Sequence, residues 1–370
     1  MIGWLTEQID TPALVIDLTV MEANIERNQA FAEQAGVRYR PHSKTHKMLP
    51  VAHQQIRRGA QGITVAKLGE AEVMAAAGIN DIFIANQIVG EPKLRRLEAL
   101  SRRIKLAVGL DNLQQAMILS RIFAAAGRPL EVMIEVNTGH NRAGLRPDQI
   151  PSFCGEISPL PGLSIRGLFT YEGHIMGVSS RDEMLRVAGE TQRQLAAAAR
   201  AVAAVTGRPC AASIGSTLAL RSERIEPGIT ELRSGTCVFN DSTQAQILGH
   251  TDWCAATVLA TISSAPDPDR VVIDAGSKAL SSDQRPGSLL RNEGFGRIKG
   301  VPGMVVTSLS EEHGVLSGPG VAERLPGVGS KVEVIPNHIC AAVNLFDQAY
   351  GIRNGRVEAV WPVAARGRSQ

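Results

Sequence analysis

The sequence has no apolar stretch that approaches the roughly 18 to 20 residues needed to span a bilayer. Its first residues, MIGWLTEQID, also lack the charged segment and apolar run of a secretory signal. We therefore expect a cytoplasmic protein that does not act on a membrane.

Neither positive nor negative charge is in large excess, and cysteine is scarce. The 39 basic and 36 acidic residues leave a formal net charge of +3, and no basic run is interleaved with aromatic residues. A nucleic-acid partner is therefore not expected. The 5 cysteines are odd in number and widely spaced. This argues against a disulfide framework and for reduced thiols.

Aromatic residues make up only 4% of the chain, whereas apolar residues make up 44%. The core must therefore consist mainly of Ala, Val, Leu and Ile, and its size excludes a disordered or fibrous protein. A length of 370 residues suits two domains, or one large barrel with an appendage.

Short β-rich runs alternate with helix-like segments rich in Ala and Leu over most of the chain. Several of the helix-like segments end in glycine, at Gly78, Gly127 and Gly207, as helices commonly do. The alternation predicts an α/β fold with a parallel (β/α)8 TIM-like barrel, and a doubly wound open sheet is the alternative. The eight β-rich runs are residues 37–41, 62–67, 81–86, 105–110, 130–136, 165–171, 211–215 and 229–235.

Strand-and-turn patterns replace the helical ones after about residue 245. RVVIDAG, KVEVIPNHIC, and the pair QAYGIR and RVEAVWPVA joined through Asn-Gly predict an antiparallel β domain with a tight hairpin. The early strand PALVID is assigned to this domain, because the barrel already has its eight strands without it. We therefore expect a barrel over residues 18–245 and a β-rich domain over residues 246–370 that includes residues 10–17.

Unusual polar residues follow five of the eight predicted barrel strands. In barrels of this kind the chemistry sits at the C-terminal ends of the strands, so these residues should meet at one rim. The segments that carry them are PHSKTHK (41–47), NTGHNRAG (137–144), TYEGH (170–174), SIGST (213–217) and RSGT (233–236).

The turns SIGST and SGT follow the seventh and eighth strands, where barrels often bind a phosphate through backbone N–H groups. Each turn alone is also an ordinary helix N-cap. A lysine at the end of the first strand, beside a phosphate site, suggests pyridoxal phosphate, because an amine beside other cations can have a lowered pKa and react with an aldehyde. Lys44 is the candidate, and Lys47 is its competitor.

Several motifs in one order resemble the fold-type III pyridoxal phosphate enzymes, the alanine racemase-like barrels. Within these the sequence resembles the D-threonine aldolase and D-serine dehydratase family. The resemblance runs nearly end to end and rests on DTPALVIDL, RPHSKTHK, KLGEAEVMAAAGINDIFIANQIVG, NTGHNRAG, GLFTYEGH, SIGST, SEEHG and PNHICAAVNLFD.

The resemblance implies a role for each of the matching residues. Lys44 would form the Schiff base with the cofactor. Arg142 would contact the cofactor's phenolic oxygen, Tyr171 would lie near its ring, and Arg233 would face its pyridine nitrogen. The phosphate would be bound by Ser216, Thr217, Gly235 and Thr236.

His338 and Cys340 resemble the family's metal pair. If KVEVIPNHIC is a strand, residues two apart share a face, so the imidazole and the thiolate can hold one ion. The alternative is an ordinary polar residue and a small core residue. A thiolate with an imidazole favours zinc, with manganese or magnesium as alternatives. His313, in SEEHG, is a weaker candidate near that site.

The resemblance implies a homodimeric lyase that acts on a small β-hydroxy D-amino acid with the help of a divalent ion. A D-threonine aldolase yields glycine and acetaldehyde, and His174 is a candidate base for the hydroxyl. A D-serine or D-threo-3-hydroxyaspartate dehydratase, with Lys44 as the base at Cα, is the alternative. A non-catalytic carrier of the cofactor is the alternative from another class; the metal pair argues against it.

Overall fold

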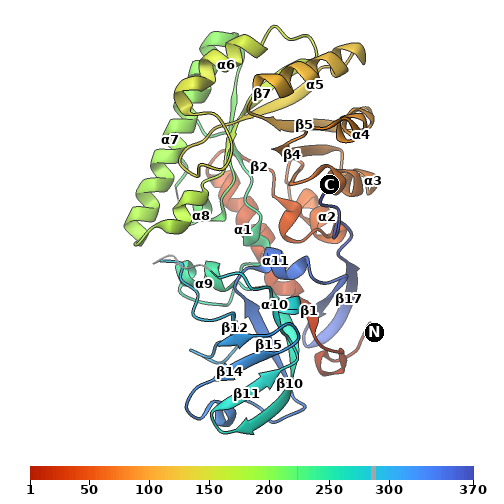
Figure 1. Cartoon of the computed structure of the whole chain (residues 1–370), viewed down its shortest axis with the longest axis vertical. Coiled ribbons are helices and arrows are strands. Elements are labelled where there is room, and N and C mark those ends of the chain that lie inside the picture. Colours follow the sequence, from red (N-terminus) through yellow and green to blue (C-terminus); the bar gives the residue numbers. More distant parts are fainter. Residues whose placement is uncertain (223, 285–288) are drawn as a thin grey trace. The chain divides into compact units, whose positions relative to one another are not determined.

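The computed structural model describes residues 1–222, 224–284 and 289–370 (Figure 1). The chain divides into two compact units. One unit consists of residues 28–44, 51–235 and 367–370, and the other of residues 1–27, 45–50 and 236–366. Among the described residues, no helix combines the length and the apolarity needed to cross a membrane. The five cysteines all lie in the described residues and form no disulfide bond, as the sequence predicts.

The first unit contains a curled parallel sheet of eight strands in the order β2-β9-β8-β7-β6-β5-β4-β3. Every predicted barrel strand is present, and the predicted (β/α)8 fold is confirmed. A parallel bridge between His42 and Thr64 joins the two ends of the sheet. The strands are β2 Arg38–Tyr39, β3 Ile63–Val65, β4 Asp81–Gln87, β5 Lys105–Leu110, β6 Leu130–Glu135, β7 Leu163–Thr170, β8 Ala211–Ile214 and β9 Glu231–Leu232.

Helices follow most of these strands and bury an apolar stripe against the sheet. Asn112 and Ser180 cap two of them by accepting hydrogen bonds from backbone N–H groups. Gly207 ends the longest helix with a φ of 65°, a left-handed conformation that favours glycine. The helices are α1 Leu18–Gln34, which contributes to both units, α2 Leu49–Arg57, α3 Leu68–Ala76, α4 Glu91–Ser101, α5 Leu113–Ala125, α6 Ile150–Ile157, α7 Arg181–Thr206 and α8 Thr217–Leu220.

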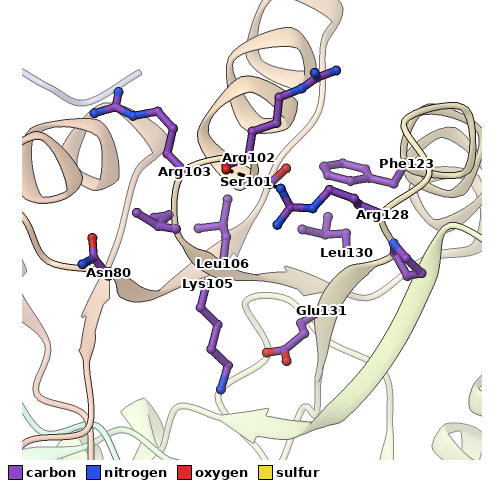
Figure 2. Close-up of a pocket in the computed structure, with 12 residues that line it drawn as sticks. Asn80, Ser101, Arg102, Arg103, Lys105, Leu106, Phe123, Arg128, Leu130 and Glu131 are labelled. Atoms are coloured by element: carbon purple, nitrogen blue, oxygen red, sulfur yellow. Dashed lines mark hydrogen bonds between the residues drawn. The ribbon is translucent and has the colours of Figure 1, made fainter.

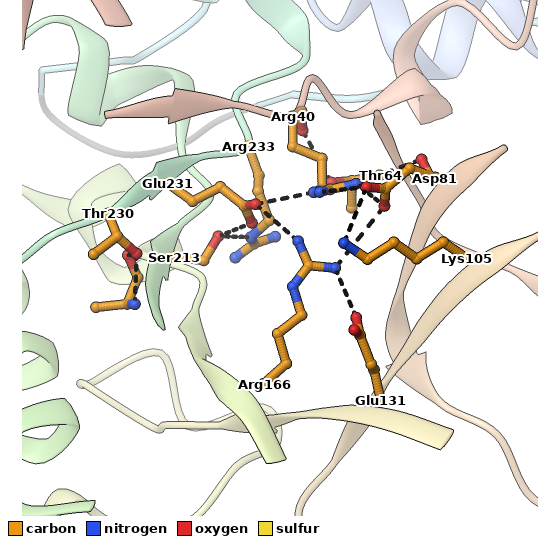
Figure 3. A network of polar contacts seen from close by, with 11 residues as sticks. Arg40, Thr64, Asp81, Lys105, Glu131, Arg166, Ser213, Thr230, Glu231 and Arg233 are labelled. Atoms are coloured by element: carbon orange, nitrogen blue, oxygen red, sulfur yellow. Dashed lines mark hydrogen bonds and ion pairs between the residues drawn. The ribbon is translucent and has the colours of Figure 1, made fainter. Parts of the chain in front are cut away.

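The barrel interior is layered because alternate residues of each strand share a face. The first layer, at the N-terminal ends of the strands, is an ion-pair network built around Arg40, Arg166 and Glu231 (Figure 3). Arg166 enters it beside an irregularity in the pairing of β6 with β7. The next layer is apolar and contains Phe83, Ala107, Met133 and Phe169.

The second unit is built on a nine-stranded sheet whose central path runs β13-β14-β11-β10-β1-β16-β17. The strand expected from PALVID is β1, and it pairs with β10 and β16 in this sheet. The pairs are antiparallel, as predicted, except that β1 and β16 run parallel. The strands are β1 Ala13–Asp17, β10 Ala256–Asp267, β11 Arg270–Ile273, β12 Gly296–Ile298, β13 Ser308–Leu309, β14 Gly314–Ser317, β15 Lys331–Pro336, β16 Gln348–Arg353 and β17 Arg356–Pro362.

Its local features also follow from the sequence. Asn354 and Gly355 join β16 to β17 with φ values of 51° and 72°, which is the two-residue hairpin predicted from Asn-Gly. Val258, Ile273, Leu316 and related residues pack into its aliphatic core. The helices of this unit are short: α9 Ser242–Leu248, α10 Ser277–Leu280 and α11 Ile339–Val343.

Candidate active site

Lys44 lies in a short 3-10 turn, Ser43–Thr45, just after β2. Its Nζ is 5.4 Å from the centroid of the Tyr171 ring, which follows β7. The Arg142 guanidinium is 5.1 Å from the same centroid. Cations favour the faces of aromatic rings, so the ring holds the amine and the guanidinium near each other. The ends of three strands therefore bring Lys44, Arg142 and Tyr171 together.

Lys47, the competing lysine, has a different setting. Its Nζ donates a hydrogen bond to Asn344 Oδ1 over 2.8 Å, within the second unit. Its backbone has a φ of 52° and its side chain is buried. The Lys47 amine thus faces Asn344, whereas the Lys44 amine lies over the Tyr171 ring beside Arg142.

Arg233 is buried inside the barrel, with 2% of its surface exposed. Its Nε donates to Ser213 Oγ and one terminal nitrogen donates to the Thr170 carbonyl, over 2.8 and 2.7 Å. Burial lowers the pKa of Arg233, while the charges of Glu231 and Glu172 oppose that effect. The guanidinium thus lies among the C-terminal ends of β7, β8 and β9.

The two predicted phosphate turns are joined, because Ser234 Oγ donates to the Ser216 carbonyl over 2.8 Å. The backbone N–H groups of Gly215 and Ser216 donate to Glu172 Oε2 over 3.2 and 2.9 Å. Thr217 begins α8 directly after them. Those two amides therefore already bind a carboxylate.

Glu172 is a residue whose role the sequence did not reveal. It is 1% exposed, and its Oε1 is buried with no hydrogen-bond partner among the residues that the structure describes. Burial raises its pKa, although backbone N–H groups and Arg233 act in the opposite direction. The only signal in the sequence was an acidic residue at a strand end, between Tyr171 and Gly173.

His174 follows β7 in the 3-10 turn Gly173–Gly177. Its Nε2 shares a hydrogen bond with Thr191 Oγ1 over 3.2 Å, and its Nδ1 is buried with no hydrogen-bond partner in the described part of the chain. Burial, followed by the charge of His140, lowers the pKa of His174. A neutral imidazole that donates from Nε2 keeps a basic lone pair on Nδ1.

His338 and Cys340 do not lie on one face of a strand, which corrects the reasoning from sequence. The strand β15 ends at Pro336; His338 is the N-cap of α11, and Cys340 is in the first turn of that helix. The cause is local, because the chain turns after Pro336 and begins a helix. The two side chains still meet, since they share a hydrogen bond.

The surroundings of this pair suit a metal ligand set. His338 Nδ1 shares a 2.6 Å hydrogen bond with Asp283 Oδ2. Burial would lower the pKa of His338, but Cys340, Asp241 and Asp283 raise it to about 9. Burial would likewise raise the pKa of Cys340, but His338 and the hydroxyls of Thr45 and Thr236 lower it to about 7. The thiolate that a metal needs is therefore accessible near neutral pH.

Within the described ranges, no group of three or more His, Cys, Asp or Glu residues is arranged to hold a metal. The pair would therefore supply two protein ligands and leave positions open for substrate or water. His313 is exposed in the turn between β13 and β14. No contact found among the described residues joins His313 to His338 or Cys340.

A cavity of about 480 Å³ lies at the other end of the barrel, beside the first residues of β5 and β6. Figure 2 shows its basic side chains pointing in different directions, with Arg128 turned toward the Arg102 carbonyl, which it contacts over 3.3 Å. Because barrel enzymes act at the C-terminal ends of the strands, this cavity is not the candidate active site.

An eight-stranded barrel with a lysine after its first strand, joined to a second β domain, defines the class of alanine racemase-like barrels. The family model "Alanine racemase, N-terminal domain" matches residues 16–243, and a model for a serine dehydratase-type domain matches residues 255–352. The chain is 33% identical to a D-threonine aldolase from Arthrobacter sp., over 98% of this chain and 94% of that one. It is 34% identical to the D-threo-3-hydroxyaspartate dehydratase of Delftia sp., over 90% and 91%.

Solved structures of D-amino acid aldolases and dehydratases are also similar to this chain. The D-threonine aldolase of Filomicrobium marinum matches with a TM-score of 0.90 and 31% identity, covering 99% of this chain and 98% of that one. Two alanine variants of D-threo-3-hydroxyaspartate dehydratase match with TM-scores of 0.90 and 0.88, at 31% identity, covering 97% of this chain and 96% and 98% of theirs. They replace a histidine and a cysteine two positions apart, and the cysteine variant is in the metal-free form. The chain belongs to this fold-type III pyridoxal phosphate family of D-amino acid aldolases and dehydratases.

Proposed function

We propose that the protein is a D-threonine aldolase that depends on pyridoxal phosphate and a divalent metal ion, and cleaves β-hydroxy D-amino acids. D-threonine would yield glycine and acetaldehyde. Family membership supports the class of reaction. The observation that carries the aldolase assignment is His174, which follows β7 and whose buried Nδ1 has no hydrogen-bond partner among the described residues. Burial lowers the pKa of His174, which favours the neutral imidazole.

The barrel residues fit the cofactor. When bound, pyridoxal phosphate supplies an aldehyde that bonds to an amine and a ring that accepts electrons released at Cα. Lys44 would hold the aldehyde, Arg142 the phenolic oxygen and Arg233 the ring nitrogen, with Tyr171 beside the ring. The absence of a Cβ at Gly215 supports this arrangement, because a Cβ there would come within 2.8 Å of the Arg233 guanidinium.

The phosphate would be bound by Ser216, Thr217, Gly235 and Thr236. Because Glu172 already binds the Ser216 N–H, Ser216 would offer its hydroxyl to the phosphate. A glycine at position 235 would let the backbone come close to the phosphate.

His338 and Cys340 would hold the metal ion. A thiolate and an imidazole favour zinc, with manganese or magnesium as alternatives. The two variants of D-threo-3-hydroxyaspartate dehydratase support this pair, because they alter a histidine and a cysteine with the same spacing. The ion, when bound, supplies positive charge that acidifies a hydroxyl of the substrate.

The Cys340 thiol contacts the hydroxyls of two residues that directly follow proposed cofactor residues in the chain. Thr45, the residue after Lys44, accepts a hydrogen bond from Cys340. Thr236, the residue after Gly235, is hydrogen-bonded to the same thiol. One peptide bond joins Lys44 to Thr45, and another joins Gly235 to Thr236. Each therefore links a proposed cofactor residue to a residue that contacts Cys340.

His174 would accept the proton of the β-hydroxyl group, which is the event that begins cleavage between Cα and Cβ. In the alternative, a D-serine or D-threo-3-hydroxyaspartate dehydratase, Lys44 would instead remove the Cα proton. The Delftia relative favours that alternative, whereas the aldolase relative matches over a larger share of this chain. A homodimer is also proposed, on the resemblance to the family alone.

The product assay separates these activities. Purified protein with cofactor and Zn²⁺, Mn²⁺ or Mg²⁺ is incubated with D-threonine, D-serine or D-threo-3-hydroxyaspartate. Acetaldehyde and glycine without ammonia support the aldolase. Keto acid with ammonia supports the dehydratase and contradicts the aldolase. A protein that binds the cofactor but yields neither product is a carrier.

A further inference from the structure

The hydroxyl of Ser213 connects Arg233 to the ion-pair network of the barrel (Figure 3). It lies 2.8 Å from Arg233 Nε and 2.8 Å from Glu231 Oε1. Guanidinium groups only donate hydrogen bonds, and carboxylates only accept them. The Ser213 hydroxyl must therefore accept from Arg233 and donate to Glu231, so the direction of this chain of hydrogen bonds is fixed.

Glu231 is itself held in place. Its other oxygen accepts from Arg40 Nε over 2.9 Å and from Arg166 over 3.4 Å. Arg40 in turn pairs with Asp81 over 2.6 Å. Burial would raise the pKa of Glu231, but the charges of Arg40 and Arg166 lower it overall. Glu231 is thus an anchored carboxylate.

Two contacts fix the orientation of the Arg233 guanidinium. The Thr170 carbonyl accepts from one terminal nitrogen, and the Ser213 hydroxyl accepts from Nε. The rings of Phe83 and Phe169 lie 5.6 and 5.2 Å away and offer no hydrogen bond in return. Without Ser213 the guanidinium would be held by one of these two hydrogen bonds only and could turn about it.

We propose that Ser213 and Glu231 are positioning residues for Arg233, and hold its guanidinium in the single orientation that meets the cofactor's ring nitrogen. The inference rests on the proposed function, which gives Arg233 that role. Neither Ser213 nor Glu231 touches the substrate in this account. They act through Arg233, as outer-shell partners do at other catalytic sites.

Ser213→Ala removes the link without adding a charge. Glu231→Gln is a poorer test, because it leaves Arg40 and Arg166 unbalanced in the core. Ser213→Cys is the second variant, since it keeps the size of the side chain but bonds only weakly. Ser120→Ala is the matched control: Ser120 is also buried, and its Oγ accepts from the Gly162 N–H in a contact that shares no residue with this chain of hydrogen bonds.

The experiment compares the four proteins loaded with pyridoxal phosphate and metal. We expect Ser213→Ala to lower kcat for D-threonine about ten- to hundredfold, the range for one hydrogen bond to a charged group. Ser213→Cys should fall between it and the wild type. Both should shift the visible absorbance band of the bound cofactor or the pH at which it titrates, whereas Ser120→Ala should not.

Ser213 variants that match the wild type and Ser120→Ala in both kcat and spectrum would overturn the inference. A loss of stability without a spectral change would also overturn it, because that is a structural role alone. A wild-type protein that shows no cofactor band would instead contradict the proposed function, so the two failures are distinguishable.

Discussion

The Cys340 thiol donates a hydrogen bond to the Thr45 hydroxyl across 3.3 Å. The thiol comes from the first turn of α11, and Thr45 is the residue after the candidate cofactor lysine. When a metal ion holds the sulfur as thiolate, the same hydroxyl can reverse its role and donate to it. Thr45 would then orient a metal ligand, the usual task of an outer-shell group.

Asp283→Asn should weaken metal binding about 10- to 100-fold, because the Asp283 carboxylate orients the His338 imidazole over 2.6 Å. Titration with Zn²⁺ followed by elemental analysis measures the effect. Asp347→Asn is the control, since Asp347 is exposed and its carboxylate pairs with Arg366. Equal metal affinity in both variants would contradict the assignment of His338.

His174→Gln should lower kcat for cleavage of D-threonine by about 10²- to 10⁴-fold, the usual contribution of a general base. The affinity for pyridoxal phosphate should stay near that of the wild type, because His174 bonds to Thr191 and not to a proposed cofactor residue. Stopped-flow or steady-state assays of acetaldehyde measure the rate. An unchanged kcat would remove His174 from the mechanism.

Glu172→Gln should become more stable relative to the wild type as pH rises. Burial raises the folded-state pKa of Glu172 above its ordinary value of 4.5, so the stability linked to its protonated form is lost as pH rises through that pKa. Glutamine mimics the protonated group and does not titrate. The difference in Tm between variant and wild type should therefore grow as the pH rises above 4.5, the ordinary pKa of this group, and a constant difference would contradict the raised pKa.

Arg40→Met should destabilise the barrel by about 3 to 5 kcal/mol, since it leaves Glu231 and Asp81 without their main partner in a buried network. Urea unfolding measures the loss. Arg186→Met is the control, because the exposed Arg186–Glu190 pair on α7 should contribute little. A small and equal effect in both variants would show that the network does not stabilise the fold.

Periodicity was sufficient to predict the barrel, because each strand run and each helix stripe carries its own signal. It also located Lys44, Arg142 and Tyr171, since parallel strands place their C-terminal ends at one rim. The carboxylate of Glu172 on the Gly215 and Ser216 amides was not predictable, because such a contact joins residues more than 40 positions apart. The position of His338 at the start of a helix was also not predicted, because the β-rich pattern of KVEVIP does not indicate where α11 begins.

Borohydride reduction of the cofactor-loaded protein, followed by mass mapping of its peptides, tests the central claim most directly. Reduction fixes pyridoxal phosphate on the amine that holds it. The account predicts the added mass on Lys44, with loss of the visible band in Lys44→Ala. Added mass on Lys47 or another lysine, with an unchanged band in Lys44→Ala, would contradict it.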